Sequence, residues 1–213
     1  MAEANQQAIA DFVRRLAVTP APARMFNPWV DTCSLDSAHY PAAGRRARLV
    51  QHLSAPNPRL LLVGEAPGYQ GCRYSGVAFT SERLICEGAI PRIPMTSRFT
   101  SRRLPWSEPS ATIVWGGLYE HSLAEDTILW NATPWHPYKD GPHTNRTPTP
   151  AEVLAGRPFL LGILGLFPGI QVAALGRIAS KTLTEAGVPH ALLRHPANGG
   201  ATEFRAGLAK IAG

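Results

Sequence analysis

The sequence predicts an α/β fold, a three-layer α/β/α sandwich with a short, mostly parallel, four-stranded central sheet. The first observation is a set of four short apolar runs, at residues 59–64, 127–131, 171–175 and 191–194. Continuous apolar runs of this length are typical of strands that are buried on both faces. The second observation is that segments with a helical pattern separate several of these runs. Strands that alternate with helices form parallel sheets covered by helices on both faces.

Five segments have the pattern of helices: residues 4–16, 45–53, 150–166, 176–186 and 202–212. In the first segment, the apolar residues from Ile9 to Leu16 recur at helical spacing. The third begins at Thr149 and Pro150, a capping residue followed by a proline in the first turn. The fourth is followed by Gly187, and glycine commonly ends helices. These segments supply the outer layers of the predicted sandwich.

The length, composition and net charge of the chain limit the classes of protein to which it can belong. A length of 213 residues fits a single domain, residues 1–213, and 45% hydrophobic residues suffice to fill a core. The net charge of +6 favours polyanionic partners, nucleic acid above all. Residues 1–16 lack the apolar region of a signal peptide, and no apolar run reaches the length of a membrane span. We therefore expect a monomeric, cytoplasmic, nucleoid-associated protein without membrane contact.

The chain has three cysteines, Cys33, Cys72 and Cys86. They form no C-x-x-C pair, and their number is odd. This arrangement fits neither a disulfide framework nor a four-thiolate metal or iron–sulfur site. The sequence therefore predicts reduced thiols and implies no metal and no organic cofactor.

Polar residues stand at the ends of three predicted strands. Glu65 follows the first run, Asn131 ends the second, and His195 follows the fourth. Because ligands of parallel sheets bind beyond the carboxyl ends of the strands, these side chains are candidates for one site. Each also has an ordinary structural explanation: a tight Gly-Pro turn at residues 64–68, an Asx-turn at Asn131, and a hydrogen-bonded structural histidine at His195. Phe79, on a glycine-rich loop, is either a stacking face or part of the core.

The order of these segments carries more information than each segment alone. The chain has Gly64-Glu-Ala-Pro-Gly68, then Phe79, then Asn131, then His195-Pro196. In this order the chain resembles the uracil-DNA glycosylase superfamily over about residues 58–205. The resemblance implies an α/β/α sandwich that flips uracil out of uracil-containing DNA and hydrolyses its N-glycosidic bond. It also implies base flipping, because that bond is inaccessible inside the duplex.

The resemblance also implies roles for individual residues. His195 would donate to uracil O2 as negative charge develops there, and Asn131 would pair with N3–H and O4. Phe79 would stack on the flipped base. Glu65 is the candidate polar catalytic residue of the turn. The remaining candidates for the pocket lining are Gly64, Ala66, Pro67, Gly68 and Tyr69.

The chain departs from the superfamily pattern in three places. In the branch with the most active enzymes, Asp and Tyr stand at the positions of Ala66 and Gly68. The branches that carry a GEAPG turn usually bind an iron–sulfur cluster, which three cysteines cannot hold. The loop after His195 lacks the bulky apolar wedge that fills the gap left by a flipped base. Because Gly68 leaves room in the pocket, exclusion of thymine is left to Tyr69 or Gln70.

Two segments are candidates for contact with DNA. The stretch 92–106 is basic and irregular, with aromatic residues among its arginines, and a second polar loop after Asn131 holds Lys139, His143 and Arg146. The alternative for both is a solvated surface loop. Arg194, beside His195, is a further candidate for a phosphate contact. The predicted DNA-binding residues are Arg98, Arg102, Arg103, Arg194, Asn198 and Gly199.

Two other functions fit the same residues. One is a lesion-binding protein with little catalysis, since Ala66 stands where some relatives carry Asp. The other is a glycosylase for another deaminated base, such as hypoxanthine or xanthine, since Gly68 makes the pocket roomier. A free-nucleoside hydrolase fits less well, because the chain is basic and its 92–103 segment is rich in arginine.

Overall fold

The computed structural model describes residues 2–37 and 41–213. Its centre is a four-stranded parallel sheet in the order β3-β2-β5-β6. The strands are β2 (Leu60–Gly64), β3 (Thr127–Asn131), β5 (Gln171–Leu175) and β6 (Ala191–Leu193). The four apolar runs of the sequence thus form the four strands of the central sheet, which confirms the predicted fold class.

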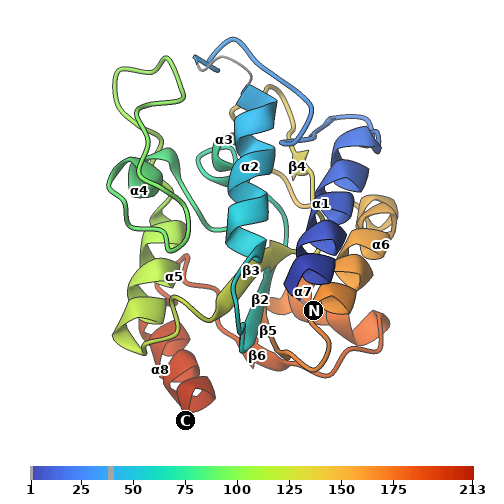
Figure 1. Cartoon of the computed structure of the whole chain (residues 1–213), viewed down its shortest axis with the longest axis vertical. Helices are drawn as coiled ribbons and strands as arrows, with labels where there is room; N and C mark the ends of the chain where they lie inside the picture. The colour runs from blue at the N-terminus through green and yellow to red at the C-terminus, as the bar shows by residue number, and fades with distance from the viewer. Residues whose placement is uncertain (1, 38–40) are drawn as a thin grey trace.

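Helices cover both faces of this sheet (Figure 1). Leu60 and Leu62 of β2 belong to one hydrophobic core, which includes residues of α5 (Pro109–Glu120) and α8 (Ala201–Ala212). Leu61 and Val63 point to the other core. Four helices contribute to that second core: α1 (Ala2–Val18), α2 (Pro41–Leu53), α6 (Pro150–Leu166) and α7 (Arg177–Glu185). The side chains of β2 therefore alternate between two apolar layers, which explains why its sequence is continuously apolar.

Short elements complete the fold. Helices α3 (Cys72–Ser75) and α4 (Glu82–Cys86) lie between β2 and α5 in the chain. Strands β1 (Met25–Phe26) and β4 (His136–Pro137) pair in antiparallel fashion, with Phe26 opposite His136. Among the described residues, no helix has the length and hydropathy needed to cross a membrane.

The predicted helix limits are close to those observed. The helix expected at 4–16 extends over 2–18, the one at 45–53 begins already at Pro41, and the one at 176–186 covers 177–185. Helix α5 is an element that the sequence analysis did not identify. It contains two adjacent glycines, and glycine lowers helix propensity. A Cβ on Gly117 would lie 3.0 Å from Leu208 and 3.1 Å from the ring of Phe204, so glycine here favours close packing of α5 on α8.

The strand register places the ends of β2 and β3, which carry candidate site residues, next to each other at one edge of the sheet. Gly64, the last residue of β2, pairs with Asn131, the last residue of β3. Beyond these ends the backbone of β3 continues to hold the turn that follows β2, since Ala132 N donates to Gly64 O (2.8 Å) and Thr133 N to Glu65 O (2.9 Å). The edge strand β3 is also fixed from outside, because the buried His52 Nε2 accepts from Leu129 N at 2.8 Å. Burial lowers the pKa of His52 to about 3, so the ring is neutral and can accept.

Candidate active site

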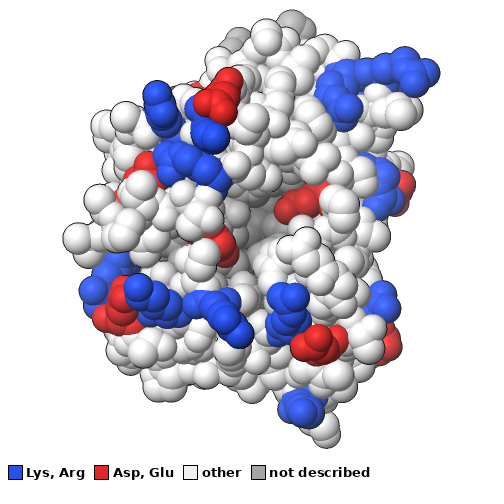
Figure 2. Space-filling view, turned by 180° about the vertical axis from the view of Figure 1, so that it is seen from behind, with Lys and Arg blue, Asp and Glu red and all other residues white. Residues whose placement is uncertain are grey.

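A cavity of about 390 Å³ opens beyond the carboxyl ends of the strands. One face of the molecule is hollowed near its middle, with acidic side chains at the edge of the hollow and Lys and Arg side chains spread around it (Figure 2). The cavity volume lies within the range that small-molecule sites usually have, about 300–1,000 Å³. The lining residues are Glu65, Ala66, Pro67, Gly68, Phe79, Glu108, Ser110, Asn145, Arg146, Thr147 and His195.

The structure brings together the turn after β2, Phe79 and His195, three segments that are distant in the sequence. Glu65 presents its carboxyl group from the turn. Burial raises the pKa of this carboxyl, and a hydrogen bond from Thr147 partly opposes that effect. Glu65 is therefore a partly desolvated acid at the wall of the cavity, a position from which it can hold a water molecule.

His195 stands two residues after β6 and also lines the cavity. Its Nδ1 accepts a hydrogen bond from Ala197 N at 3.1 Å. Burial lowers the pKa of His195, and the charge of Arg194 adds to this effect. A neutral ring whose Nδ1 is an acceptor carries its proton on Nε2. The second ring nitrogen is thus a hydrogen-bond donor available at the cavity.

Phe79 and Asn131 are neighbours at Gly64. A Cβ on Gly64 would overlap with Phe79 Cζ and would lie 2.8 Å from Asn131 Oδ1. Phe79 is 7% exposed, has a φ of 50°, and places its ring centroid 6.4 Å from that of His195. Phe79 is therefore both a core residue and a part of the cavity lining, so the two alternatives of the sequence analysis are compatible.

Asn131 is in a different position from that expected. It is 5% exposed and borders a small void with Trp29 and Cys72 rather than the main cavity. Its side chain makes no hydrogen bond to any residue in the described ranges. The amide therefore keeps its donor and acceptor groups free, and it lies beside Phe79 at the back of the site.

Four lining residues have no counterpart in the sequence analysis: Glu108, Ser110, Asn145 and Thr147. Glu108 and Ser110 stand at the start of α5, and the other two flank Arg146, a candidate for DNA contact, in the loop before α6. Neither segment follows an apolar strand, so the rule that located the other candidates does not reach them. The clearest available signal was Thr149, whose capping box with Glu152 fixes the start of α6 just after this loop.

Asn145 and Arg146 have positioning contacts. Asn145 Oδ1 accepts from Tyr69 N and from His136 Nε2, each at 3.1 Å, and so connects its loop to the turn after β2. Arg146 forms a two-bond ion pair with Glu152, at 2.6 and 2.7 Å. The positive charge of Arg146 is therefore matched before any ligand enters the cavity.

Tyr69 was expected in the pocket lining but is not among the lining residues. Its ring lies edge-on to Trp106, with centroids 5.4 Å apart. Trp106 also stacks on Tyr74, and the guanidinium of Arg102 lies 3.7 Å above its ring. These contacts join the 92–106 stretch to the rim of the cavity through an aromatic cluster.

The candidate DNA-binding residues fall into two groups. The guanidinium of Arg98 already has partners within the protein, since it pairs with Glu82 of α4 at 3.1 Å and donates to the carbonyl of Arg102. Arg103 and Arg194, by contrast, are exposed. In the loop after His195, Asn198 and Gly199 are also exposed and have φ angles of 54° and 79°. The second group is accessible to a large ligand, whereas Arg98 organises the loop.

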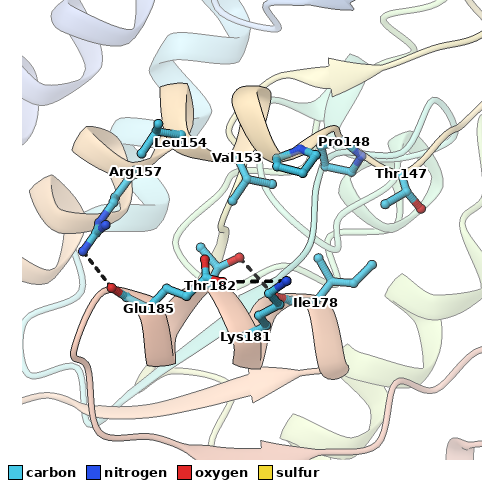
Figure 3. A pocket seen from close by; sticks show the side chains of 10 residues that line it. Thr147, Pro148, Val153, Leu154, Arg157, Ile178, Lys181, Thr182 and Glu185 are labelled. Carbon is cyan, nitrogen blue, oxygen red and sulfur yellow. Dashed lines mark hydrogen bonds and ion pairs between the residues drawn. The ribbon is translucent and has the colours of Figure 1, made fainter.

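A second cavity, of about 360 Å³, lies between α6 and α7 (Figure 3). Val153 of α6 and Ile178 of α7 are among its mainly apolar lining, and Arg157 donates to the backbone oxygen of Glu185 at 2.9 Å. It shares Thr147 with the first cavity but contains none of the residues at the strand ends. The chemistry-bearing groups thus gather in the first cavity.

Comparisons with known proteins agree with this geometry. The family model of the uracil DNA glycosylase superfamily matches residues 51–210, and the chain belongs to this superfamily. Its members are DNA glycosylases, hydrolases that bind DNA. The fold is similar to that in the crystal structure of wild-type Pedobacter heparinus SMUG2, with a TM-score of 0.65 and 17% identity, over 98% of this chain and 95% of that chain. No curated protein matches the chain.

Proposed function

We propose that this protein excises uracil from DNA by hydrolysing the N-glycosidic bond, which leaves an abasic site. The observation that carries the proposal is the neutral His195, whose Nδ1 accepts from Ala197 N and whose Nε2 is left as a donor at a cavity shared with Glu65 and Phe79. In such a hydrolysis the base leaves as an anion and the sugar gains oxocarbenium character. A fixed donor toward the base is what that charge requires.

His195 would donate to a carbonyl oxygen of the base as charge develops on it. A preorganised donor of this kind is typically worth about 3 kcal/mol in the transition state. The ring is neutral before the reaction and keeps its proton on Nε2. The hydrogen bond from Nε2 to the base therefore becomes stronger as negative charge grows on the base. Phe79, 6.4 Å from His195 between ring centroids, would supply the stacking face for the base.

Asn131 would read the base, because an amide can donate and accept on the same edge. Cytosine presents the reversed donor and acceptor pattern to a fixed amide, so it would be rejected. This role requires the base to share the space near Gly64 with Phe79. The side chains of Phe79 and Asn131 already meet there. The hydrogen-bonding capacity of Asn131 within the described chain is unused, which is consistent with a ligand as its partner.

Glu65 would position the water that attacks the sugar. Its carboxyl group lines the cavity, and burial raises its pKa, which makes the carboxylate a better proton acceptor. The water would add its oxygen to the sugar carbon as the bond to the base breaks, and its proton would pass to the carboxylate. Ala66, the next residue, has no group that can perform this task.

Exposed basic and polar residues would hold the DNA around the flipped nucleotide. Arg103 and Arg194 are the candidates for phosphate contacts, with Arg102 beside them on Trp106 and with Asn198 and Gly199 in the loop after His195. Phosphate contacts fix the position of a protein on DNA without reading its sequence. The net charge of +6 agrees with such a partner.

The test is a strand-cleavage assay on a labelled oligonucleotide that contains one deoxyuridine, followed by alkali treatment. Matched oligonucleotides carry thymine, cytosine or hypoxanthine at the same place. We expect breakage at uracil. Binding to the deoxyuridine oligonucleotide without breakage at any base would replace the proposal with a lesion-binding function.

A second candidate is excision of another deaminated base, such as hypoxanthine. The observation in its favour is that Ala66 and Gly68 present little or no side chain to a cavity of about 390 Å³. A purine is larger than uracil and would use this room. Breakage at hypoxanthine in the same assay, at a rate equal to or above that at uracil, distinguishes this candidate from the first.

A further inference from the structure

Glu108 completes the cavity wall where two glycines leave it open. Its Oε1 lies 3.5 Å from the place that a Cβ on Gly68 would take. A Cβ on Gly71 would overlap with Oε2 of the same carboxyl group. The carboxyl of Glu108, which comes from the residue before α5, thus fills the space in front of two backbone positions near β2. A Cβ on Gly68 would make an ordinary contact with this carboxyl, whereas one on Gly71 would collide with it.

The carboxyl of Glu108 is incompletely satisfied by the protein. Ser110 Oγ donates to Oε1 at 3.2 Å. Within the described part of the chain, the buried Oε2 has no hydrogen-bond partner. Burial raises the pKa of Glu108 to about 7, so near neutral pH a large share of these groups is the uncharged acid. A neutral carboxyl tolerates an enclosed, unpaired oxygen such as Oε2 better than a carboxylate does, because it carries no charge.

The groups around Glu108 do not compensate a negative charge. Glu65 and His195 line the same cavity, and His195 is neutral. Arg146 is there too, but Glu152 pairs with it at 2.6 Å. Cys72 is buried, and the charge of Glu108 adds to the rise of its pKa. The position therefore suits a compact hydrogen-bonding group rather than half of an ion pair.

We propose that Glu108 is a specificity-determining residue, whose carboxyl group forms the wall of the base pocket beside Gly68 and limits which bases enter. This inference rests on the proposed function of the same site. The hydrogen bond from Ser110 to Oε1 and the close approach of the buried Oε2 to Gly71 hold this carboxyl in place. A base with a larger ring or with a methyl group at this wall would have to displace the carboxyl. That displacement lowers its rate relative to uracil.

The experiment compares single-turnover release of uracil, thymine and hypoxanthine by the parent, Glu108→Ala and Glu108→Gln. Rates are expressed relative to the base that the parent releases fastest. Glu108→Ala opens the wall, so the relative rate of at least one larger base should rise by about tenfold or more. Glu108→Gln keeps both size and hydrogen-bonding capacity and should keep the parent's order of bases. Glu203→Ala, an exposed carboxyl on α8, is the matched control and should leave the ratios unchanged.

A second variant tests the same wall from its other side. Gly71→Ala places a methyl group where Oε2 stands, so the carboxyl must move. We expect Gly71→Ala to change the base ratios in the parent and to have no further effect in the Glu108→Ala background, because the displaced group is then gone. If Gly71→Ala changes the base ratios equally in the parent and in the Glu108→Ala background, the contact between Gly71 and the Glu108 carboxyl does not determine these ratios.

The results separate this inference from the proposed function. If the parent releases uracil and Glu108→Ala has the same base ratios as the parent, only the role of Glu108 is overturned. Parent that releases no base would overturn the proposed function. In that case the same variants are compared by fluorescence anisotropy on oligonucleotides with 2′-fluoro-deoxyuridine or 2′-fluoro-thymidine, where loss of discrimination in Glu108→Ala supports the wall and equal discrimination overturns it.

Discussion

Phe79 lies against Gly64 so closely that no side chain fits between them. A Cβ on Gly64 would overlap with the ring at Cζ, and it would also lie 2.8 Å from Asn131 Oδ1. The structure does not give Gly64 a positive φ, so its backbone conformation is open to other residues. Glycine is needed here because of the close approach of a ring. The close packing of Phe79 and Asn131 against the end of β2 thus depends on the absence of a Cβ at Gly64.

Gly64→Ala should therefore displace Phe79 and lower both stability and activity. Overpacking of this kind typically costs about 1–3 kcal/mol. Urea denaturation measures the loss of stability, and single-turnover excision measures the effect on the base pocket. Gly165→Ala, in α6 with open space around its Cβ, is the control and should be neutral or stabilising. Equal stability of Gly64→Ala and the parent would show that Phe79 moves without cost.

His195→Ala should slow the chemical step and spare DNA binding. Removal of one preorganised donor typically lowers the rate by about 10²–10³-fold. Quenched-flow measurement of base release under single-turnover conditions gives the rate, and anisotropy with the same oligonucleotide gives the affinity. Because the ring contacts the backbone only through Ala197 N, the fold should tolerate the change. An unchanged single-turnover rate would remove His195 from the mechanism.

Asn131→Asp should weaken the preference for uracil over cytosine. The substitution keeps the shape of a side chain that is 5% exposed but replaces its donor with a second acceptor. The loss of one well-placed pairing should reduce the uracil rate by about tenfold or more. Parallel assays with uracil and cytosine at the same position measure the ratio. If both rates equal those of the parent, Asn131 does not read the base.

Much of the fold could be predicted because the strands are short, apolar and separated by helices. All four central strands are predicted, since each reads as a continuous apolar run, although Leu192 of the edge strand β6 is 58% exposed. Helix α5 was missed because Gly116 and Gly117 weaken the helical pattern, although Gly117 allows close packing on α8. Local propensity carries no information on such long-range contacts.

The candidate site could be predicted in part for a similar reason. Glu65 and His195 follow strands, and parallel strands deliver their ends to one edge of the sheet. Glu108 and Asn145 reach the same cavity from loops whose course depends on distant contacts, such as that of Asn145 with Tyr69 N. Arg98 was taken for a DNA contact because its charge is visible in the sequence, whereas its pairing with Glu82 is visible only in the fold.

Replacement of Arg103 and Arg194 by Gln should weaken DNA binding and its dependence on salt. Both side chains are exposed, and each phosphate contact typically contributes about 0.9 to the slope of log K against log salt. The double variant should therefore bind more weakly at low salt and lose about 2 units of slope. Anisotropy titrations between low and moderate salt measure this change. Arg14→Gln, on α1 and paired with Asp11, is the control and should keep the slope of the parent.

The Arg146–Glu152 pair should stabilise the loop beside the cavity in a way that depends on pH. The hydrogen bonds from Arg146 lower the pKa of Glu152 below its ordinary value of 4.5. A carboxyl with a lowered pKa contributes stability above its unfolded value, and this contribution disappears as the pH falls through the folded pKa.

Glu152→Gln should therefore cost about 1–2 kcal/mol at pH 7, allowing for partial exposure of the pair. The difference from the parent should shrink steadily below pH 4.5. Urea denaturation of both proteins at pH 7 and at pH 3 measures the two differences. Glu125→Gln, whose carboxyl is 73% exposed and lies 3.5 Å from Arg92, is the control and should change stability by less than about 1 kcal/mol. A cost for Glu152→Gln that is the same at both pH values would mean that the charge of this carboxylate does not contribute to stability.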